Sequence, residues 1–345
     1  MLTERQKLIL KMIIDDYVHS AEPVGSRVIA KKDSISYSSA TVRNEMSDLE
    51  EMGYLEQPHT SAGRIPSQKG YRFYVDYLME PANLSKADIE SIRTLLYQKK
   101  LQMEDIVSNT ASILADLTHY TAIVLGPEVF QTKLRSIQII PLSNTNCVCI
   151  LVTDTGHVEK KIVTIPPELP IEQLERLANI LNAKLVGTPL YKLSQVLYHE
   201  LAEELKRTID HFEHALEFAE GMISPKDIRD HRGVFLKGTT HMLSQPEFKD
   251  IDKVKTLLTL FEQNGLVVDL FTNQSSNIEV KIGQENQIIE AHNCSIITAN
   301  YIYNGKAIGS IGVIGPTRLD YAKVITLIDY VSNDLSKIFN KLYKE

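Results

Sequence analysis

The first eighty residues contain three short helical patterns followed by two short strand patterns. Apolar residues spaced three and four apart predict helices over residues 3–20, 25–32 and 39–52. Extended patterns follow over residues 54–58 and 64–66, and a few small polar residues with one glycine separate them. This order is typical of a winged helix-turn-helix, whose third helix enters a DNA groove. The sequence therefore predicts a DNA-binding head at the start of the chain.

The third helical pattern carries the residues best suited to contact bases. Wound at 100° per residue, it places Val42, Met46 and Leu49 on one face, which we expect to be buried. The opposite face and its flanks carry small and hydrogen-bonding candidates for the major groove: Ser39, Thr41, Arg43, Asn44 and Ser47. An asparagine amide can make two hydrogen bonds to adenine, and an arginine can reach guanine or phosphate. The alternative is an exposed polar helix face without a DNA contact.

The segment between the two strand patterns ends in Arg64, and two further basic residues, Lys69 and Arg72, follow it. A small tip of this kind can enter or straddle a minor groove, where a narrow groove favours arginine. We therefore expect these three side chains to contact the minor groove or phosphates, although the tip alone is also compatible with a solvated turn. Any basic surface must be local, because 37 Lys and Arg face 44 Asp and Glu, a net charge of −7.

Beyond the head, strand patterns lie on both sides of a long helical block. Residues 85–120 are predicted to be helical. Strands begin at residue 123 and return at 267–271 and beyond, before a final helix over 321–343. This arrangement predicts an α+β multidomain chain in which one domain is interrupted by an insertion. The expected division is as follows: head 1–80, helical linker 81–104, interrupted α+β domain 105–190 and 266–345, and insertion 191–265.

Composition narrows the class of protein further. The 345 residues are 43% hydrophobic and 23% charged, which is ordinary for a globular protein of two or three domains. No apolar run is long enough for a membrane helix, and the N-terminus lacks the pattern of a signal peptide. The three cysteines, an odd number, argue against a disulfide framework and a cysteine zinc site. We therefore expect a cytoplasmic protein without a membrane partner.

Several longer motifs, taken together, resemble one family. They are Ser39–Met46 with Leu49-Glu50 and Gly53–Leu55; Thr60–Ser67 with Lys69–Arg72 and Tyr74–Asp76; Ile282–Asn286; and Gly309–Arg318 with Tyr321. In this order they resemble the bacterial heat-inducible transcription repressors of the HrcA type over essentially the whole chain. Leu319 stands where the family pattern has methionine, a mild departure.

The resemblance implies a non-enzymatic, dimeric repressor of chaperone operons that needs no cofactor. It implies a winged-helix head and a GAF-like domain into which a dimerisation domain is inserted. It also implies an inverted-repeat DNA operator called CIRCE, and a GroE-type chaperonin that helps to keep the repressor active. We expect heat to act through a folding equilibrium of a marginally stable chain. Two chains are expected to meet at apolar residues of the insertion region: Leu197, Leu201, Phe212, Phe218, Phe235, Leu257 and Phe261.

Two other interpretations of the residues that follow the head remain open. In the first, the repressor is ligand-gated and its GAF-like domain binds an effector; Arg318 and Tyr321 then either line a pocket or brace the last helix. In the second, from a different class, His199, His211 and His214 form the centre of a metal hydrolase. No HExxH-like carboxylate motif surrounds these histidines, so the pattern favours solvated helix residues.

Overall fold

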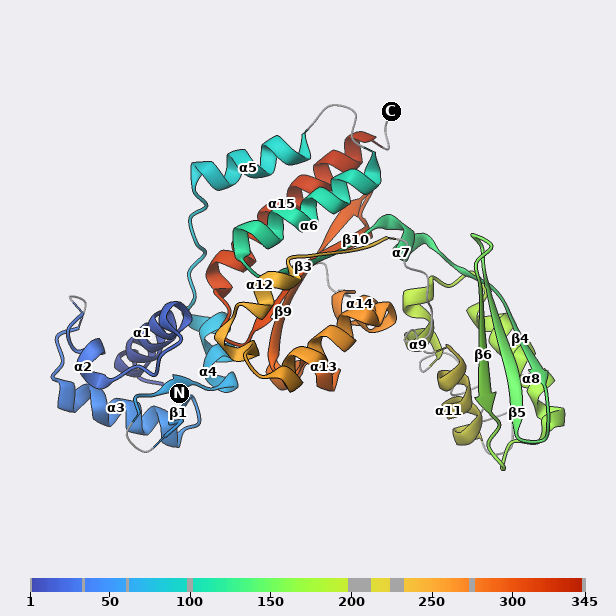
Figure 1. Ribbon diagram of the computed structural model, residues 1–345, viewed down its shortest axis with the longest axis horizontal. Helices are drawn as coiled ribbons and strands as arrows, with labels where there is room; N and C mark the ends of the chain where they lie inside the picture. The colour runs from blue at the N-terminus through green and yellow to red at the C-terminus, as the bar shows by residue number, and fades with distance from the viewer. Residues whose placement is uncertain are drawn as a thin grey trace.

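The computed structural model describes residues 2–32, 35–59, 62–97, 102–197, 212–223, 233–272 and 277–342. It shows a helical head at the N-terminus, a central domain with a five-stranded sheet, and an inserted unit with a three-stranded sheet. The head and the inserted unit lie at opposite ends of the long axis, with the central domain between them (Figure 1). No helix in the described part of the chain is long and apolar enough to cross a membrane.

The head has the predicted order of three helices and a two-stranded ribbon. Its elements are α1 (Glu4–Ser20), α2 (Ser26–Ile29), α3 (Ser39–Glu51), β1 (Leu55–Glu56) and β2 (Ile65–Pro66). The two strands pair antiparallel, and we call this ribbon, residues 55–66, the wing. Val24 pairs with the wing in the manner of a short third strand, because its backbone exchanges two hydrogen bonds of 2.9 Å with that of Arg64. The wing is thereby attached to the segment between α1 and α2.

Local sequence signals explain where these helices begin and end. The Thr3 hydroxyl accepts a hydrogen bond from the Gln6 amide at 3.2 Å, and the Gln6 side chain accepts one from the Thr3 amide at 3.0 Å. This is the predicted capping box at the start of α1. Ser38 caps α3 through the Thr41 amide at 3.1 Å, and Gly53 follows α3 with a φ of +78°.

The stretch expected to be helical over residues 85–120 contains two successive helices. α4 (Gln68–Phe73) and a π-helical turn (Tyr74–Leu78) lead out of the head, and α5 (Lys86–Leu96) and α6 (Met103–Thr118) follow. A second capping box, between Gln102 and Asp105, starts α6 as a new helix.

The central domain is built on an antiparallel sheet with the order β7-β3-β10-β9-β8. Its strands are β3 (Thr121–Leu125), β7 (Val234–Lys237), β8 (Glu279–Ile282), β9 (Cys294–Tyr303) and β10 (Lys306–Pro316). β3 finds both of its partners much later in the chain, since Leu125 lies opposite Val234 on one side and Ser310 on the other. The three consecutive strands β8, β9 and β10 pair in sequence order, whereas β3 joins the sheet through partners far along the chain.

Helices cover both faces of the central sheet (Figure 1). The covering helices not yet given are α7 (Pro127–Gln131), α12 (Thr239–Leu243), α13 (Ile251–Glu262), α14 (Asn264–Phe271) and α15 (Tyr321–Leu342). α6 and α15 share a buried cluster with Ala122 and Val124, whereas α13 and α14 share one with Ile123 and Leu125. Alternate residues of β3 are thus buried on opposite faces, which explains why the strand is apolar throughout.

The inserted unit has its own hydrophobic core. Its elements are β4 (Leu134–Pro141), β5 (Asn146–Thr153), β6 (Val158–Thr164), α8 (Ile171–Leu185), α9 (Leu193–Val196) and α11 (Phe212–Ile223). One face of the sheet packs on α8 and α11, with Cys147, Cys149 and Leu151 in the buried cluster. The other face carries Ile140, Val148 and Ile162 in one cross-strand row. A separate sheet with a separate core makes this unit an independent body.

The structure divides the chain differently from the expected boundaries. The core of the inserted unit extends from Leu134 to Ile223, whereas the insertion was expected over residues 191–265. Strands β4, β5 and β6 pair only with one another, and the segment from β7 to α14 belongs to the central domain. The strand patterns before residue 190 had been assigned to the interrupted domain because a sequence does not show which strands pair. GAF-like ancestry and the dimerising role stay proposals.

One further expectation in this region was wrong, and three of the residues expected at the dimer contact are buried. Residues 267–271, expected as a strand, form the end of helix α14, since a short apolar run fits a buried helix as well as a buried strand. Leu197, Phe218 and Leu257 are buried within the chain, so their side chains are not an exposed surface for a second copy. Leu201 lies outside the described residues.

Candidate nucleic-acid interface

The face of α3 opposite its buried side is open to solvent. Arg43, Asn44 and Ser47 are exposed, whereas Val42 and Leu49 on the other side are fully buried. The helical geometry deduced from spacing is confirmed, since the candidate base-reading side chains share the free face. An exposed helix face with an amide and a guanidinium in its first two turns can enter a major groove.

Ser39 and Thr41 lie at the start of α3 and are only partly exposed. The Ser39 hydroxyl lies 3.3 Å from that of Ser26 on α2, and the Thr41 hydroxyl lies 2.9 Å from that of Ser38. Both hydroxyls therefore already have protein partners: Ser39 joins α3 to α2, and Thr41 contacts the residue that caps α3. The structure separates them from the three exposed candidates.

A buried carboxylate under α3 fixes the helix on α1. Glu45 is 6% exposed, and its carboxylate lies 2.5 Å from the Arg5 guanidinium, which also lies over the Tyr37 ring. Sequence analysis did not select Glu45, because a glutamate in a polar helix gives no periodic signal. Its position next to the buried Met46 was the available hint.

Arg64 and Lys69 are turned toward the protein. The Arg64 guanidinium pairs with Glu50 of α3 at 2.7 Å, and the Lys69 ammonium donates to the Met52 carbonyl at 2.8 Å. Lys69 also lies 4.5 Å from the ring centroid of Tyr54. These contacts attach the wing and α4 to the C-terminal end of α3, where a cation offsets the helix dipole. Arg64 also neutralises a carboxylate that would repel phosphate.

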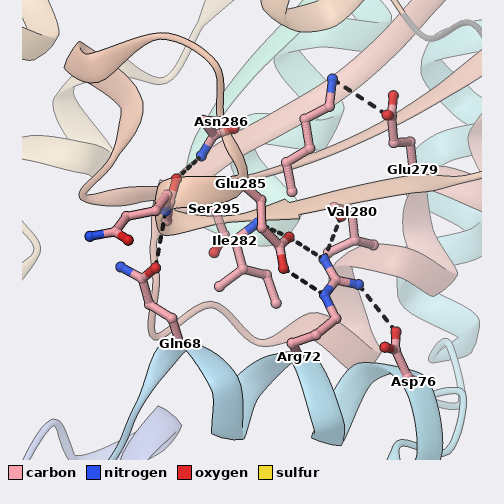
Figure 2. A network of polar contacts seen from close by, with 12 residues as sticks. Gln68, Arg72, Asp76, Glu279, Val280, Ile282, Glu285, Asn286 and Ser295 are labelled. Atoms are coloured by element: carbon pink, nitrogen blue, oxygen red, sulfur yellow. Dashed lines mark hydrogen bonds and ion pairs between the residues drawn. The ribbon is translucent and has the colours of Figure 1, made fainter.

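Arg72 faces the central domain. Figure 2 shows its guanidinium between Glu285 and the Val280 carbonyl of the central domain, with Asp76 on its own helix beside it. The structure therefore does not bring Arg72 together with the exposed residues of α3. Its partners lie far away in the sequence, so no local pattern could have indicated them.

Two basic residues that sequence analysis missed lie in and just after α2. Arg27 and Lys31 are exposed, and neither makes an ion pair with any residue that the structure describes. In helix-turn-helix proteins the helix before the recognition helix crosses the DNA backbone. This order of elements was the signal that could have identified them. Their exposure and place in the fold make them candidates for phosphate contacts.

Arg318 and Tyr321 brace the central domain against the head. The Arg318 guanidinium bonds to the Glu247 carboxylate at 2.5 Å, to the Gln245 side chain at 3.0 Å and to the Val18 carbonyl of α1 at 2.6 Å. The Tyr321 hydroxyl is buried and hydrogen-bonded, and burial raises its pKa above the ordinary value. Their polar groups are thus used within the protein.

The described residues do not assemble a metal centre. No group of three or more His, Cys, Asp and Glu side chains among them is arranged to hold a metal ion. His214 is half-buried on α11, while His199 and His211 lie outside the described residues. Burial raises the pKa of all three thiols, to about 12 for Cys294, so they are protonated and unreactive near neutral pH.

Comparison with known proteins agrees with this geometry. Residues 1–75 match the family described as "Winged helix-turn-helix transcription repressor, HrcA DNA-binding", and residues 104–325 match "HrcA protein C terminal domain". The fold is similar to a crystal structure of a hypothetical protein, with a TM-score of 0.62 and 24% identity over 99% of both chains. That similarity supports the fold alone.

Two similar relatives are heat-inducible transcription repressors named HrcA. The one from Brevibacillus brevis is 47% identical and the one from Bacillus pumilus is 44% identical, each over all 345 residues of this chain and 100% of the relative. These relatives are named as repressors and not as enzymes. With both family matches in order and identity of this extent, the chain belongs to the HrcA family of heat-inducible transcription repressors.

Proposed function

We propose that this repressor binds an inverted-repeat operator of the CIRCE type as a homodimer, with one α3 in the major groove of each half-site. The supporting observation is the exposed Arg43–Asn44–Ser47 face on a helix whose other side is pinned by buried contacts. A rigid helix with a free polar face can read bases at small entropic cost.

Within this interface the polar and basic residues have different tasks. Asn44 and Arg43 read base edges, with Ser47 beside them, and Arg27 and Lys31 neutralise phosphates. Ser39 and Thr41 support the start of α3. Arg64 and Lys69 hold the wing, which approaches the minor groove through its tip.

The test is a competition between DNA duplexes. Purified protein is titrated with the inverted repeat upstream of its own operon and with a scrambled duplex of the same composition. We expect the wild type to prefer the inverted repeat strongly and Arg43→Ala to lose this preference. The control variant Arg93→Ala, which removes an exposed arginine from α5, should keep it. Equal affinity of the wild type for both duplexes would contradict sequence-specific repression.

The outer face of the inserted sheet supports the homodimer proposal. Ile162 and Val158 of edge strand β6 are 64% and 55% exposed, and Ile140 of β4, in the same cross-strand row as Ile162, is 44% exposed. An apolar sheet face of this kind is typical of a protein interface. An inverted repeat has two-fold symmetry, which a symmetric pair of chains matches. The proposed occupant is a second copy of the chain.

The regulatory part of the proposal concerns heat. The repressor acts in the cytoplasm on chaperone operons, loses its DNA-binding form on heating, and is restored by a GroE-type chaperonin. Small domains joined by polar contacts have limited stability, so a few degrees can change the folded fraction. The contacts of Arg318 and Tyr321 do not favour a ligand-gated mechanism, because both side chains make their polar contacts with protein groups.

A further inference from the structure

One side of α4 faces the loop that follows β8, and Arg72 is its main polar contact (Figure 2). The guanidinium donates two hydrogen bonds to the Glu285 carboxylate, 2.9 Å from Nε and 2.5 Å from Nη2, and Nη2 also donates to the Val280 carbonyl at 2.6 Å. Nη1 bonds to Asp76 at 3.1 Å. All three guanidinium nitrogens are therefore engaged, in the bidentate geometry of the strongest arginine–carboxylate pairs.

The loop that receives Arg72 is shaped by its own contacts. The Glu285 carboxylate accepts a hydrogen bond from the Ile282 amide at 2.8 Å, which directs it toward α4. The buried Asn286 side chain donates to three backbone carbonyls of the segment 283–294, at 2.8 to 3.1 Å. The acceptor is thus held in place by the central domain itself and does not need the head for its position.

A second polar contact and an aromatic contact flank this pair. Gln68, one turn before Arg72, accepts a hydrogen bond from the Gln284 amide at 3.0 Å. A Cβ at Gly283 would lie 2.2 Å from the Gln68 side chain, so glycine permits this approach. Tyr71, which precedes Arg72 in the sequence, packs against Tyr321, with the two ring centroids 5.7 Å apart. We call these contacts of α4 with the central domain the junction.

We propose that the Arg72–Glu285 pair is a positioning contact that fixes the direction of α3 relative to the central domain and thereby selects the spacing between operator half-sites. This inference rests on the proposed dimer. The head and the inserted unit lie at opposite ends of the long axis of the molecule (Figure 1). In a dimer joined through the inserted units, the junction of each chain therefore sets where its head lies. One added base pair moves a half-site by about 3.4 Å and rotates it by roughly a tenth of a turn. A head held by a bidentate pair cannot follow that shift.

The test uses full-length protein and the variant Glu285→Gln, which changes the central domain and leaves the head intact. Affinity is measured for the operator with its native spacer, for spacers changed by one or two base pairs, and for a single half-site. We expect the wild type to bind the native spacer more tightly than the altered spacers. In Glu285→Gln this affinity ratio should fall about tenfold, which corresponds to the loss of a charged hydrogen bond. Half-site affinity and its salt dependence should stay unchanged.

Three further variants and one control variant sharpen the test. Arg72→Glu should lose the spacer preference, and the exchange Arg72→Glu with Glu285→Arg should restore it. Arg72→Lys keeps the positive charge but cannot make the bidentate contact of a guanidinium. We therefore expect this variant to fold normally and still lose part of the spacer preference. Lys86→Glu, on the exposed surface of α5, controls for the change in charge and should bind as the wild type does.

Each result that would contradict the inference has a different meaning. A Glu285→Gln protein with the full wild-type preference would overturn the inference while leaving the repressor proposal intact. An Arg72→Glu protein with weakened half-site binding and a salt slope lower by about one unit would show a phosphate contact instead. A wild type that does not distinguish the operator from scrambled DNA would overturn the proposed function itself, and the inference with it.

Discussion

Asn44 and Arg27 are both exposed polar residues of the head, but they are expected to affect DNA binding in different ways. Asn44→Ala should remove a bidentate base contact, reducing discrimination at one position of each half-site by about 1–3 kcal/mol. Binding of single-base operator variants, followed by fluorescence anisotropy, measures this. Unchanged discrimination would mean that the free face of α3 does not read bases.

Arg27→Ala is the matched comparison for a phosphate contact. The variant should weaken binding to all duplexes alike and lower the slope of log affinity against log salt by about one unit. Lys69→Ala should leave that slope unchanged, because its ammonium already bonds to the Met52 carbonyl. Titrations at several salt concentrations separate these two behaviours; a lowered slope for Lys69→Ala would place that ammonium at the DNA.

At the residue level, spacing along a helix was enough to predict which side of α3 is buried, since helical geometry is local. The partners of the basic residues were not predictable. Arg72 bonds to Glu285, which is 213 positions away, and no pattern in a single sequence reports such a pair. Arginine and lysine look alike in sequence whether they contact DNA or hold two domains together.

At the scale of elements, the wing depends on a close backbone approach at Gly63. A Cβ there would lie 2.4 Å from the Val24 carbonyl oxygen, which is rigid backbone. Gly63→Ala should therefore separate the wing from the α1–α2 segment, lower the free energy of unfolding by about 1–3 kcal/mol and weaken operator binding. Gly25→Ala, with nothing within 4 Å of its Cβ, is the control. Thermal melting of both variants tests this, and equal melting would contradict it.

The elements most easily predicted were those with strong local signals. The capping box at Thr3 marked the start of α1, and Gly53 marked the end of α3. The assignment of strands to sheets failed, because β4 to β6 follow β3 in sequence but pair in a different sheet. Strand pairing is a property of the folded chain, and local propensity does not contain it.

At the scale of the whole molecule, the dimer proposal predicts a specific surface effect. Ile162→Lys introduces a charge on the outer face of the inserted sheet, so we expect a monomer with greatly weakened operator affinity. Ile251→Lys, at an 81% exposed isoleucine of α13, should remain dimeric. Light scattering measures the mass of both proteins. A dimeric Ile162→Lys protein would place the interface elsewhere.

Heat should act on the whole molecule without a small molecule. We expect operator binding to fall on mild heating, to return incompletely on cooling, and to return further when chaperonin and ATP are present. The measurement is operator affinity before heating, after a heating and cooling cycle, and after the same cycle with chaperonin. Full spontaneous recovery without a chaperonin effect would contradict a mechanism based on folding.

The pairing of β3 has a kinetic consequence. Leu125 cannot meet Ser310 until nearly the whole chain has left the ribosome, and the inserted unit can complete its own core first. High contact order slows folding, and in the meantime an apolar strand, buried on both faces in the finished domain, stays uncovered. Slow closure around an exposed apolar strand is the condition in which a chain aggregates. Under the proposed dependence on chaperonin, newly made repressor would compete with heat-damaged proteins, and the fraction that folds would report how much chaperonin is free.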